Sequence, residues 1–465
     1  MIDHFLEIDN SYPPLFADLK SRKFPFPAPL KDGPFGYAEE FGKLRGIVYG
    51  ILAAFHHSYY TPGFIQYGII VRTVETELKP KKKGIYLIIV SRITRSIAAG
   101  MINIAFPYYI LVDLHQTAGM IGLIYVAATI ATAVLSFLAG ITTDVWGKRG
   151  TLFIASALLP VSSALVYFSS SLWVVFIAAM VGGYSATGSL VGGGIGGAVQ
   201  PIQNTIITEL TPSEKRTKYF SFLTFLSGFT AALGALLAKV FTVQEIFLVA
   251  TVIAAAGVIA LPFIEVREAK GKLRVLKTKA TIGKFTLTGI LNGFSQGLIV
   301  PFLIPFFLLI YNIPKSQMAE YAFISGIVGS VALLAAPFLE KYLGFVKSMV
   351  WTRGIGTILF VAFPIIRFLP FAIFVYVVGP ALRIMALPIQ QAELTRRVDG
   401  DEMGRALGVN QVARLAASSA GTGLAGYLMD AALFEIPFFA YGVVMIANSY
   451  LYVRFFGKKR KEIDK

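Results

Sequence analysis

Several arginines lie inside long apolar stretches of the sequence, where a charged side chain is costly and needs a partner. Arg383 lies near the middle of one stretch, and Arg92 and Arg95 lie one helical turn apart within another. A guanidinium group binds carboxylates and phosphates through paired hydrogen bonds, so these residues predict a site for an anion. The alternative is structural. Arg92 and Arg95 would then extend to the cytoplasmic surface, and Arg383 would pair with backbone carbonyls at a helix break.

Uncharged polar side chains at comparable depths extend this candidate site. Acidic residues, by contrast, lie near the ends of the apolar stretches, as Asp113 and Asp430 do. Proton-coupled carriers commonly use a buried carboxylate, so its absence favours a positive cavity that attracts an anionic solute. The predicted substrate-binding residues are Arg383, Arg95, Arg92, Asn103, Asn292, Gln296, Gln203 and Gln390.

Catalytic and metal-binding patterns are missing from the sequence. It contains no cysteine, which excludes disulfides, thiolate metal sites and a cysteine nucleophile. It contains no nucleotide-binding glycine loop followed by Lys and Ser or Thr, and the adjacent His56 and His57 point about 100° apart on a helix with no third ligand near. We therefore expect neither an enzyme nor a cofactor or metal site.

The apolar stretches themselves define the class of protein. The chain of 465 residues is 55% hydrophobic and only 15% charged, and many stretches are long enough to cross a bilayer as helices. The glycine-rich middle of the fourth predicted span is expected to bend or break it. The twelve predicted spans are 85–112, 117–139, 151–168, 172–207, 218–240, 244–264, 284–310, 319–339, 347–366, 369–394, 405–428 and 434–455.

Basic residues orient these spans. They gather on one group of connections, whereas the opposite connections carry little beyond Lys239, Lys315 and Arg367. Lys and Arg are enriched in cytoplasmic loops, so both termini are expected in the cytoplasm, with the chain as a multi-pass protein of the plasma (cytoplasmic) membrane. The net charge of +16 then reflects orientation, and no nucleic-acid partner is expected. Arg353, near the cytoplasmic end of its span, is expected to snorkel.

The two halves of the chain repeat one plan. Gly100 and Gly147 recur as Gly297 and Gly344 at an offset of 197 residues, and "PIQNTIITELTPSEKR" resembles "PIQQAELTRRVDGDEMGR" at an offset near 187 to 189. Such a repeat predicts two pseudo-symmetric six-helix bundles. The predicted regions are an N-terminal cytoplasmic extension 1–84, a bundle 85–264, a basic linker 265–283, a bundle 284–456 and a basic tail 457–465.

Between the second and third spans the sequence reads "AGITTDVWGKRG", residues 139–150. Glycines let the chain turn tightly there, and the acid Asp144 needs a partner such as a helix N-terminus. The loop resembles the signature Gly-x-x-x-Asp-Arg-x-Gly-Arg-Arg of the major facilitator superfamily of transporters, although Val145 replaces one basic residue. The resemblance in spans, repeat and loop covers residues 85–456.

This resemblance implies a latch as well as a fold. In the family, the loop aspartate is implicated in a contact with span 11 that favours the outward-open state. Asp144 would then face Arg405 and Arg414, and the second half keeps a degenerate copy of the loop; the alternative is that Asp144 only caps a turn. The predicted gating-loop residues are Gly140, Asp144, Gly147, Lys148, Arg149, Glu340, Gly344, Arg405 and Arg414.

Glycine and proline interruptions in spans 1, 4, 7 and 10, the helices that line the central cavity in the family, locate the expected substrate site. We therefore predict a secondary active or facilitative transporter of a small solute by alternating access, with an organic anion as the candidate substrate. The alternative is a transporter-like receptor or scaffold that binds solute without moving it. The expected partners are the solute and the lipid bilayer, with a coupling ion left open, and we expect a monomer.

Residues 1–84 fit none of these patterns. They are rich in proline and aromatic residues and end in "KPKKKG". A thirteenth span, an interfacial helix, a loosely structured cytoplasmic extension and a mis-assigned translation start remain as alternatives for this region.

Overall fold

The computed structural model describes residues 80–145, 147–184, 216–264, 279–397 and 403–457, with a few single positions between 199 and 207. The expected N-terminal extension up to residue 79, the linker 265–278 and the tail from residue 458 lie outside these residues. Residues 78–465 form one compact unit.

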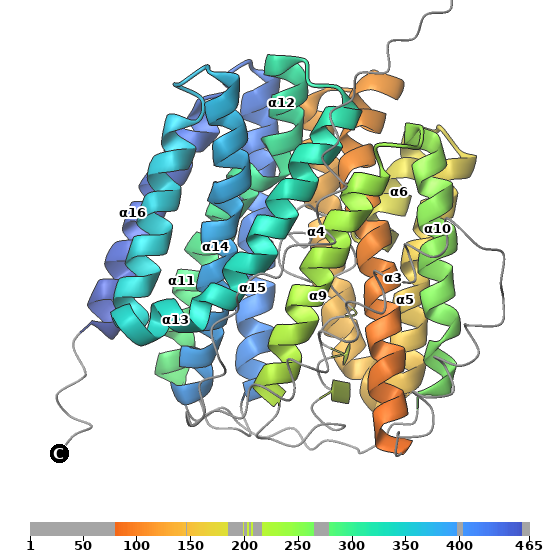
Figure 1. The fold of residues 1–465 in the computed structure, drawn as a ribbon, viewed down its shortest axis with the longest axis horizontal. Coiled ribbons are helices and arrows are strands. Elements are labelled where there is room, and N and C mark those ends of the chain that lie inside the picture. The colour runs from red at the N-terminus through yellow and green to blue at the C-terminus, as the bar shows by residue number, and fades with distance from the viewer. Residues whose placement is uncertain are drawn as a thin grey trace, which may run out of the picture. The chain divides into compact units, whose positions relative to one another are not determined.

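The N-terminal half is a set of long helices (Figure 1, orange to green). Predicted span 1 continues past Pro107 into a π-helical turn, and α6 ends at Gly182, where Gly183 takes a left-handed φ of 63° and the glycine-rich stretch begins. The elements are α3 (Pro80–Tyr108), η1 (Tyr109–Asp113), α4 (Ala118–Val145), α5 (Gly147–Phe168), α6 (Leu172–Gly182), α9 (Arg216–Leu237), α10 (Val243–Ile259) and η3 (Leu261–Phe263).

The C-terminal half (Figure 1, teal to blue) repeats this plan. Predicted span 7 is interrupted around Pro301, where a short 3-10 turn separates two helices. Predicted spans 8 and 9 lie in α13, which kinks at Gly344 (φ 71°, ψ 170°). The elements are α11 (Lys279–Ile299), η4 (Val300–Phe302), α12 (Leu303–Tyr311), α13 (Lys315–Ala362), α14 (Leu369–Arg397), α15 (Met403–Asp430) and α16 (Ile436–Phe456).

The helices match the predicted spans. By length and composition, eight segments in the described part of the chain could cross a membrane. One of the eight, α13, contains predicted spans 8 and 9, while α6, α9 and α15 correspond to predicted spans 4, 5 and 11. The prediction of an all-α membrane protein with twelve helices in two six-helix halves is therefore confirmed.

Glycine contacts show the repeat in three dimensions. A Cβ atom on Gly100 would lie 2.0 Å from the backbone oxygen of Ala231, and one on Gly297 would lie 2.0 Å from the backbone oxygen of Ser418. Gly100 and Gly297 are 197 residues apart in the sequence, and Ala231 and Ser418 are 187 apart. Both separations match the offsets of the sequence repeat. Helix α3 therefore meets α9 in the same way that α11 meets α15.

The two halves contact each other through two further helix pairs. Helix α4 packs on α15, where a Cβ atom on Gly122 would lie 3.0 Å from the Cα of Gly426. Helix α9 packs on α13, where a Cβ atom on Gly326 would lie 2.6 Å from the Cβ of Ala232. Small residues thus allow close approach between the halves as well as within them.

These contacts predict which glycines are irreplaceable. Gly100→Ala and Gly297→Ala should each lower the stability of the detergent-purified protein by about 1–3 kcal/mol, because the new methyl group meets backbone that cannot rotate away. Gly354→Ala is the matched control, since nothing lies within 4 Å of its added Cβ. Thermal melting measures all three, and equal melting temperatures would contradict the close helix contacts.

Candidate functional site

A small hollow lies between the two halves. It is lined from α3, α4, η4, α12, α13 and α14, so the proline-interrupted spans 1, 7 and 10 all contribute to it. Of the predicted site residues, Asn103 lines it. We call this space the central hollow, and its lining consists of Asn103, Pro107, Tyr125, Val300, Pro301, Leu303, Ile304, Ser325, Tyr376 and Pro380.

The central hollow is largely apolar with a few hydroxyl and amide groups. Ser325 donates a hydrogen bond of 2.9 Å to the backbone oxygen of Tyr376, which ties α13 to α14. The ring of Tyr376 packs edge-on against Phe307, with centroids 5.4 Å apart. A wall of this kind can hold the apolar body of a solute, while its polar groups orient that body.

Gln296 and Arg414 form a polar contact next to the central hollow. Gln296 lies on α11, one helical turn before Val300 of the central hollow's wall. Arg414 Nη1 donates a hydrogen bond of 3.2 Å to Gln296 Oε1. The second nitrogen of Arg414 donates to Gln411 at 2.8 Å. Arg414 was expected in the latch with Asp144, whose side-chain surroundings lie outside the described residues. The latch therefore stays a prediction, and Arg414 is held by an amide of the candidate substrate site.

Arg383 is one turn along α14 from Pro380 of the central hollow. Its guanidinium carbon lies 5.7 Å from the ring centroid of Tyr441. Its charge interacts with those of Arg353 and Arg414. Within the described part of the chain, its buried Nη1 has no hydrogen-bond partner. The C-terminal half therefore concentrates three guanidinium groups, one of them incompletely bonded.

Arg353 corrects one expectation from the sequence. Only 2% of the residue is exposed, so it does not snorkel. Its Nη1 donates to Asn448 at 2.5 Å and its Nη2 to Gln390 at 3.2 Å, and its guanidinium carbon lies 4.5 Å from the ring centroid of Tyr452. Gln390, predicted to bind substrate, is thus a partner of Arg353. Asn448 is not among the residues predicted from the sequence. Its amide, alone within an apolar span, was the signal that could have pointed to this network.

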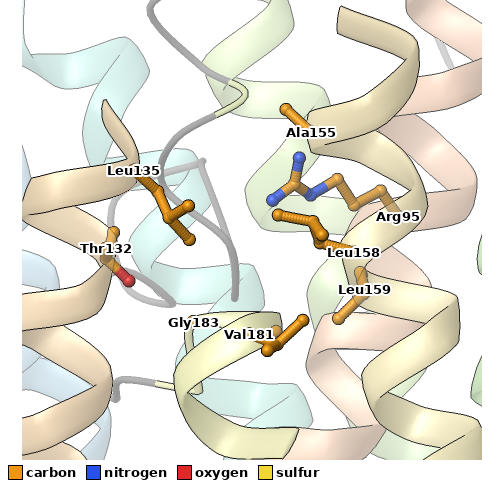
Figure 2. A pocket seen from close by; sticks show the side chains of 9 residues that line it. Arg95, Thr132, Leu135, Ala155, Leu158, Leu159, Val181 and Gly183 are labelled. Atoms are coloured by element: carbon orange, nitrogen blue, oxygen red, sulfur yellow. The ribbon is translucent and has the colours of Figure 1, made fainter. Parts of the chain in front are cut away.

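Arg92 and Arg95 are both buried, with 4% and 7% exposure, so neither reaches the surface as the structural alternative required. Arg95 points into a small hollow inside the N-terminal half, which we call the Arg95 hollow. Figure 2 shows its side chain beside Ala155 and Leu158, with Thr132 on the opposite side. The structure thus separates Arg95 from the central hollow, whereas the sequence placed both in one site.

The remaining predicted site residues are amides in helices. Asn292 lies one turn from Gln296 on α11 and is buried, with 7% exposure. Gln203 is also buried, at 2% exposure, but many residues around it in the sequence lie outside the described part of the chain.

The gating-loop glycines adopt a conformation that favours glycine. Gly147 and Gly344 have φ of 78° and 71°, and they are the pair related by the offset of 197 residues. Each lets the chain turn sharply between two helices. Of the other predicted gating residues, Gly140 and Asp144 lie in α4, Arg405 in α15 and Glu340 in α13, and Lys148 and Arg149 open α5. Within the described residues, His, Asp and Glu form no group of three suited to a metal.

Known proteins with a similar sequence pattern or fold are transporters of one superfamily. Residues 88–422 match the family model of the Major Facilitator Superfamily. The human organic anion transporter MFSD10 is 13% identical, with a TM-score of 0.60, over 81% of this chain and 100% of the other. A D-xylose-proton symporter is 17% identical (TM-score 0.63, 80% and 98% covered). The nucleoside transporter NupG is 14% identical (TM-score 0.62, 82% and 100% covered). A sequence search of curated proteins found no significant match.

The Arg353 network predicts a difference between two asparagines. Asn448→Ala should destabilise the protein by about 1–3 kcal/mol, because it leaves a buried guanidinium and the backbone oxygen of Thr288 without their partner. Asn103→Ala, the same substitution in the wall of the central hollow, should change stability by less than about 0.5 kcal/mol. Thermal melting compares the two. A larger loss for Asn103→Ala would contradict this assignment.

Proposed function

The chain belongs to the major facilitator superfamily, and we propose that it carries a small organic anion across the membrane by alternating access. Its family and its structural neighbours are transporters. In this proposal the anion binds between the two halves, and the halves rock to expose it to each side in turn.

The incompletely bonded guanidinium of Arg383 carries the proposal. Burying a cation is costly unless an opposite charge compensates it. In the described part of the chain, the carboxylates that form ion pairs bind Lys239, Arg367 and Arg397, and none pairs with Arg383 or Arg414. A carboxylate or similar anionic group of the solute would supply the missing charge and accept hydrogen bonds from Arg383 Nη1.

The central hollow suits the rest of such a solute. Its wall offers the rings of Tyr125 and Tyr376 together with aliphatic side chains, and none of the lining residues in the described part of the chain is charged. An organic acid with an apolar body would place that body in the central hollow and its charge near Arg383, one helical turn away.

The distribution of basic loops supports a plasma-membrane protein with both termini in the cytoplasm. The transporter would work as a single 6+6 unit. A receptor or scaffold with the same site would bind the anion equally well, so binding must be followed by a measurement of flux.

Thermal melting tests the anion site. Purified protein is melted with benzoate, hexanoate, phosphate, glucose or choline at concentrations up to about 10 mM. A ligand that binds the folded protein at 100 times its Kd stabilises it by about 2.7 kcal/mol. We expect benzoate or hexanoate to raise the melting temperature of the wild type and to have no effect on Arg383→Gln.

Arg367→Gln is the matched control, because it removes the same charge from an exposed ion pair with Glu435 and leaves the central hollow intact. It should respond to the anion as the wild type does. Stabilisation by glucose or choline instead, or an unchanged response in Arg383→Gln, would overturn the anion site. Uptake of the stabilising anion into proteoliposomes then separates a transporter from a receptor.

A further inference from the structure

Two charged residues join the halves at one end of the bundle. This end, which we call the outer end, carries the turns from α3 to α4, from α9 to α10, from α12 to α13 and from α15 to α16. In the orientation predicted from the basic loops it faces away from the cytoplasm. The two residues are Asp430 of α15 and Lys315 of α13, which we call the outer clasp.

Asp430 binds the beginning of α4 in the other half. Its Oδ1 accepts a hydrogen bond of 2.6 Å from the backbone N–H of Gly119, and its Oδ2 accepts one of 2.9 Å from the hydroxyl of Thr117. The Thr117 hydroxyl also accepts from the N–H of Met120 at 3.2 Å. The carboxylate and the Thr117 hydroxyl thus each accept from one N–H in the first turn of α4, where N–H groups have no partner within the helix.

Lys315 binds the end of α9 in the other half. Its Nζ donates to the backbone oxygen of Ala238 at 2.7 Å and also to that of Phe241. These carbonyls follow the last residue of α9, Leu237. Asp113 and Glu245, both in the N-terminal half, attract the same ammonium group.

Helix dipoles give these contacts a direction. A helix has a partial positive charge at its beginning and a partial negative charge at its end. Asp430 is the last residue of α15 and Lys315 the first of α13, so each charge is repelled by its own helix. Each is stabilised instead by the helix it meets across the interface, at the beginning of α4 or the end of α9.

The internal repeat places the two contacts at equivalent positions. It exchanges α4 with the first part of α13, and α9 with α15, so the α4–α15 contact corresponds to the α13–α9 contact. The charged residue lies on non-equivalent helices in the two contacts. In the first contact the acid Asp430 ends α15, and in the second the base Lys315 begins α13. Two contacts of opposite sign thus close the outer end at two separate places.

Further polar interactions at the outer end include two between the halves and one within the C-terminal half. Lys239 pairs with Glu320 at 2.5 Å, and the Tyr108 hydroxyl donates to the backbone oxygen of Ile313 at 2.7 Å; both join the two halves. Arg367 pairs with Glu435 at 2.9 Å within the C-terminal half. The last pair has the same chemistry and would be unaffected if the halves separated.

We propose that Asp430 and Lys315 form an electrostatic clasp that holds the outer end closed and biases the unliganded transporter toward opening at the opposite end. The proposal rests on alternating access by the two halves. Opening the outer end would return each charge to the unfavourable dipole of its own helix. The clasp therefore sets how often the central hollow is reached from the outer side.

The cysteine-free sequence provides a clean test. Asn103→Cys places one thiol in the wall of the central hollow, and a membrane-impermeant maleimide reaches it from the outer side only when that end opens. The labelling rate in sealed right-side-out vesicles therefore follows the open population. We expect Asp430→Asn and Lys315→Met to raise this rate about three- to tenfold each, and the double variant to raise it further.

Arg367→Gln is the matched control and should leave labelling unchanged. High salt provides a second measurement that leaves the clasp residues unmutated. Because Asp430 is exposed, salt at about 1 M should screen its charge and raise the labelling rate of the Asn103→Cys protein. The double clasp variant should respond less. Unchanged labelling in all clasp variants and at high salt would overturn the clasp. Failure of transport is measured separately, in the wild-type protein with Asn103 intact: faster labelling of the clasp variants together with no anion flux in the wild type would keep the clasp and reject the transporter.

Discussion

Helix pairs that touch backbone to backbone hold each half together, and the other features of the molecule are arranged around them. Gly100 and Gly297 let α3 approach α9 and α11 approach α15 so closely that no side chain fits between. In lipid, packing of this kind replaces the hydrophobic effect as the force between helices. The contact is the same in both halves, and close contacts between α4 and α15 and between α9 and α13 join the halves to each other.

Charge is placed unequally on this frame. Three buried guanidinium groups lie in the C-terminal half among amides and aromatic rings, and two more, those of Arg92 and Arg95, lie in the N-terminal half. Arg353 is fully engaged by Asn448, Gln390 and Tyr452, whereas Arg383 keeps a buried nitrogen without a partner in the described part of the chain. The first arrangement is that of a structural cation, and the second leaves one donor free for the anion that we propose as substrate. The acids and bases of the outer end act on the interface instead.

The known structures that resemble this chain share its fold at 13–17% identity. They transport substrates as different as an organic anion, D-xylose and a nucleoside, so the fold alone does not choose among them. The choice depends on the side chains of the central hollow and its neighbours. In this chain those are mostly apolar and aromatic residues with a few amide and hydroxyl groups, and arginines lie next to them.

The sequence by itself determined the spans, the two-half repeat and the depth of each charge, because hydropathy is averaged over a whole helix and depth follows from counting residues. It did not determine which way each side chain points, since one residue along a helix turns the direction by about 100°. Arg95 and Asn103, eight residues apart, thus line different hollows. Only the tertiary structure decided the partners of Arg353 and Arg414 and brought Asp430 to Gly119, because these contacts join residues far apart in the chain through the packing of whole helices.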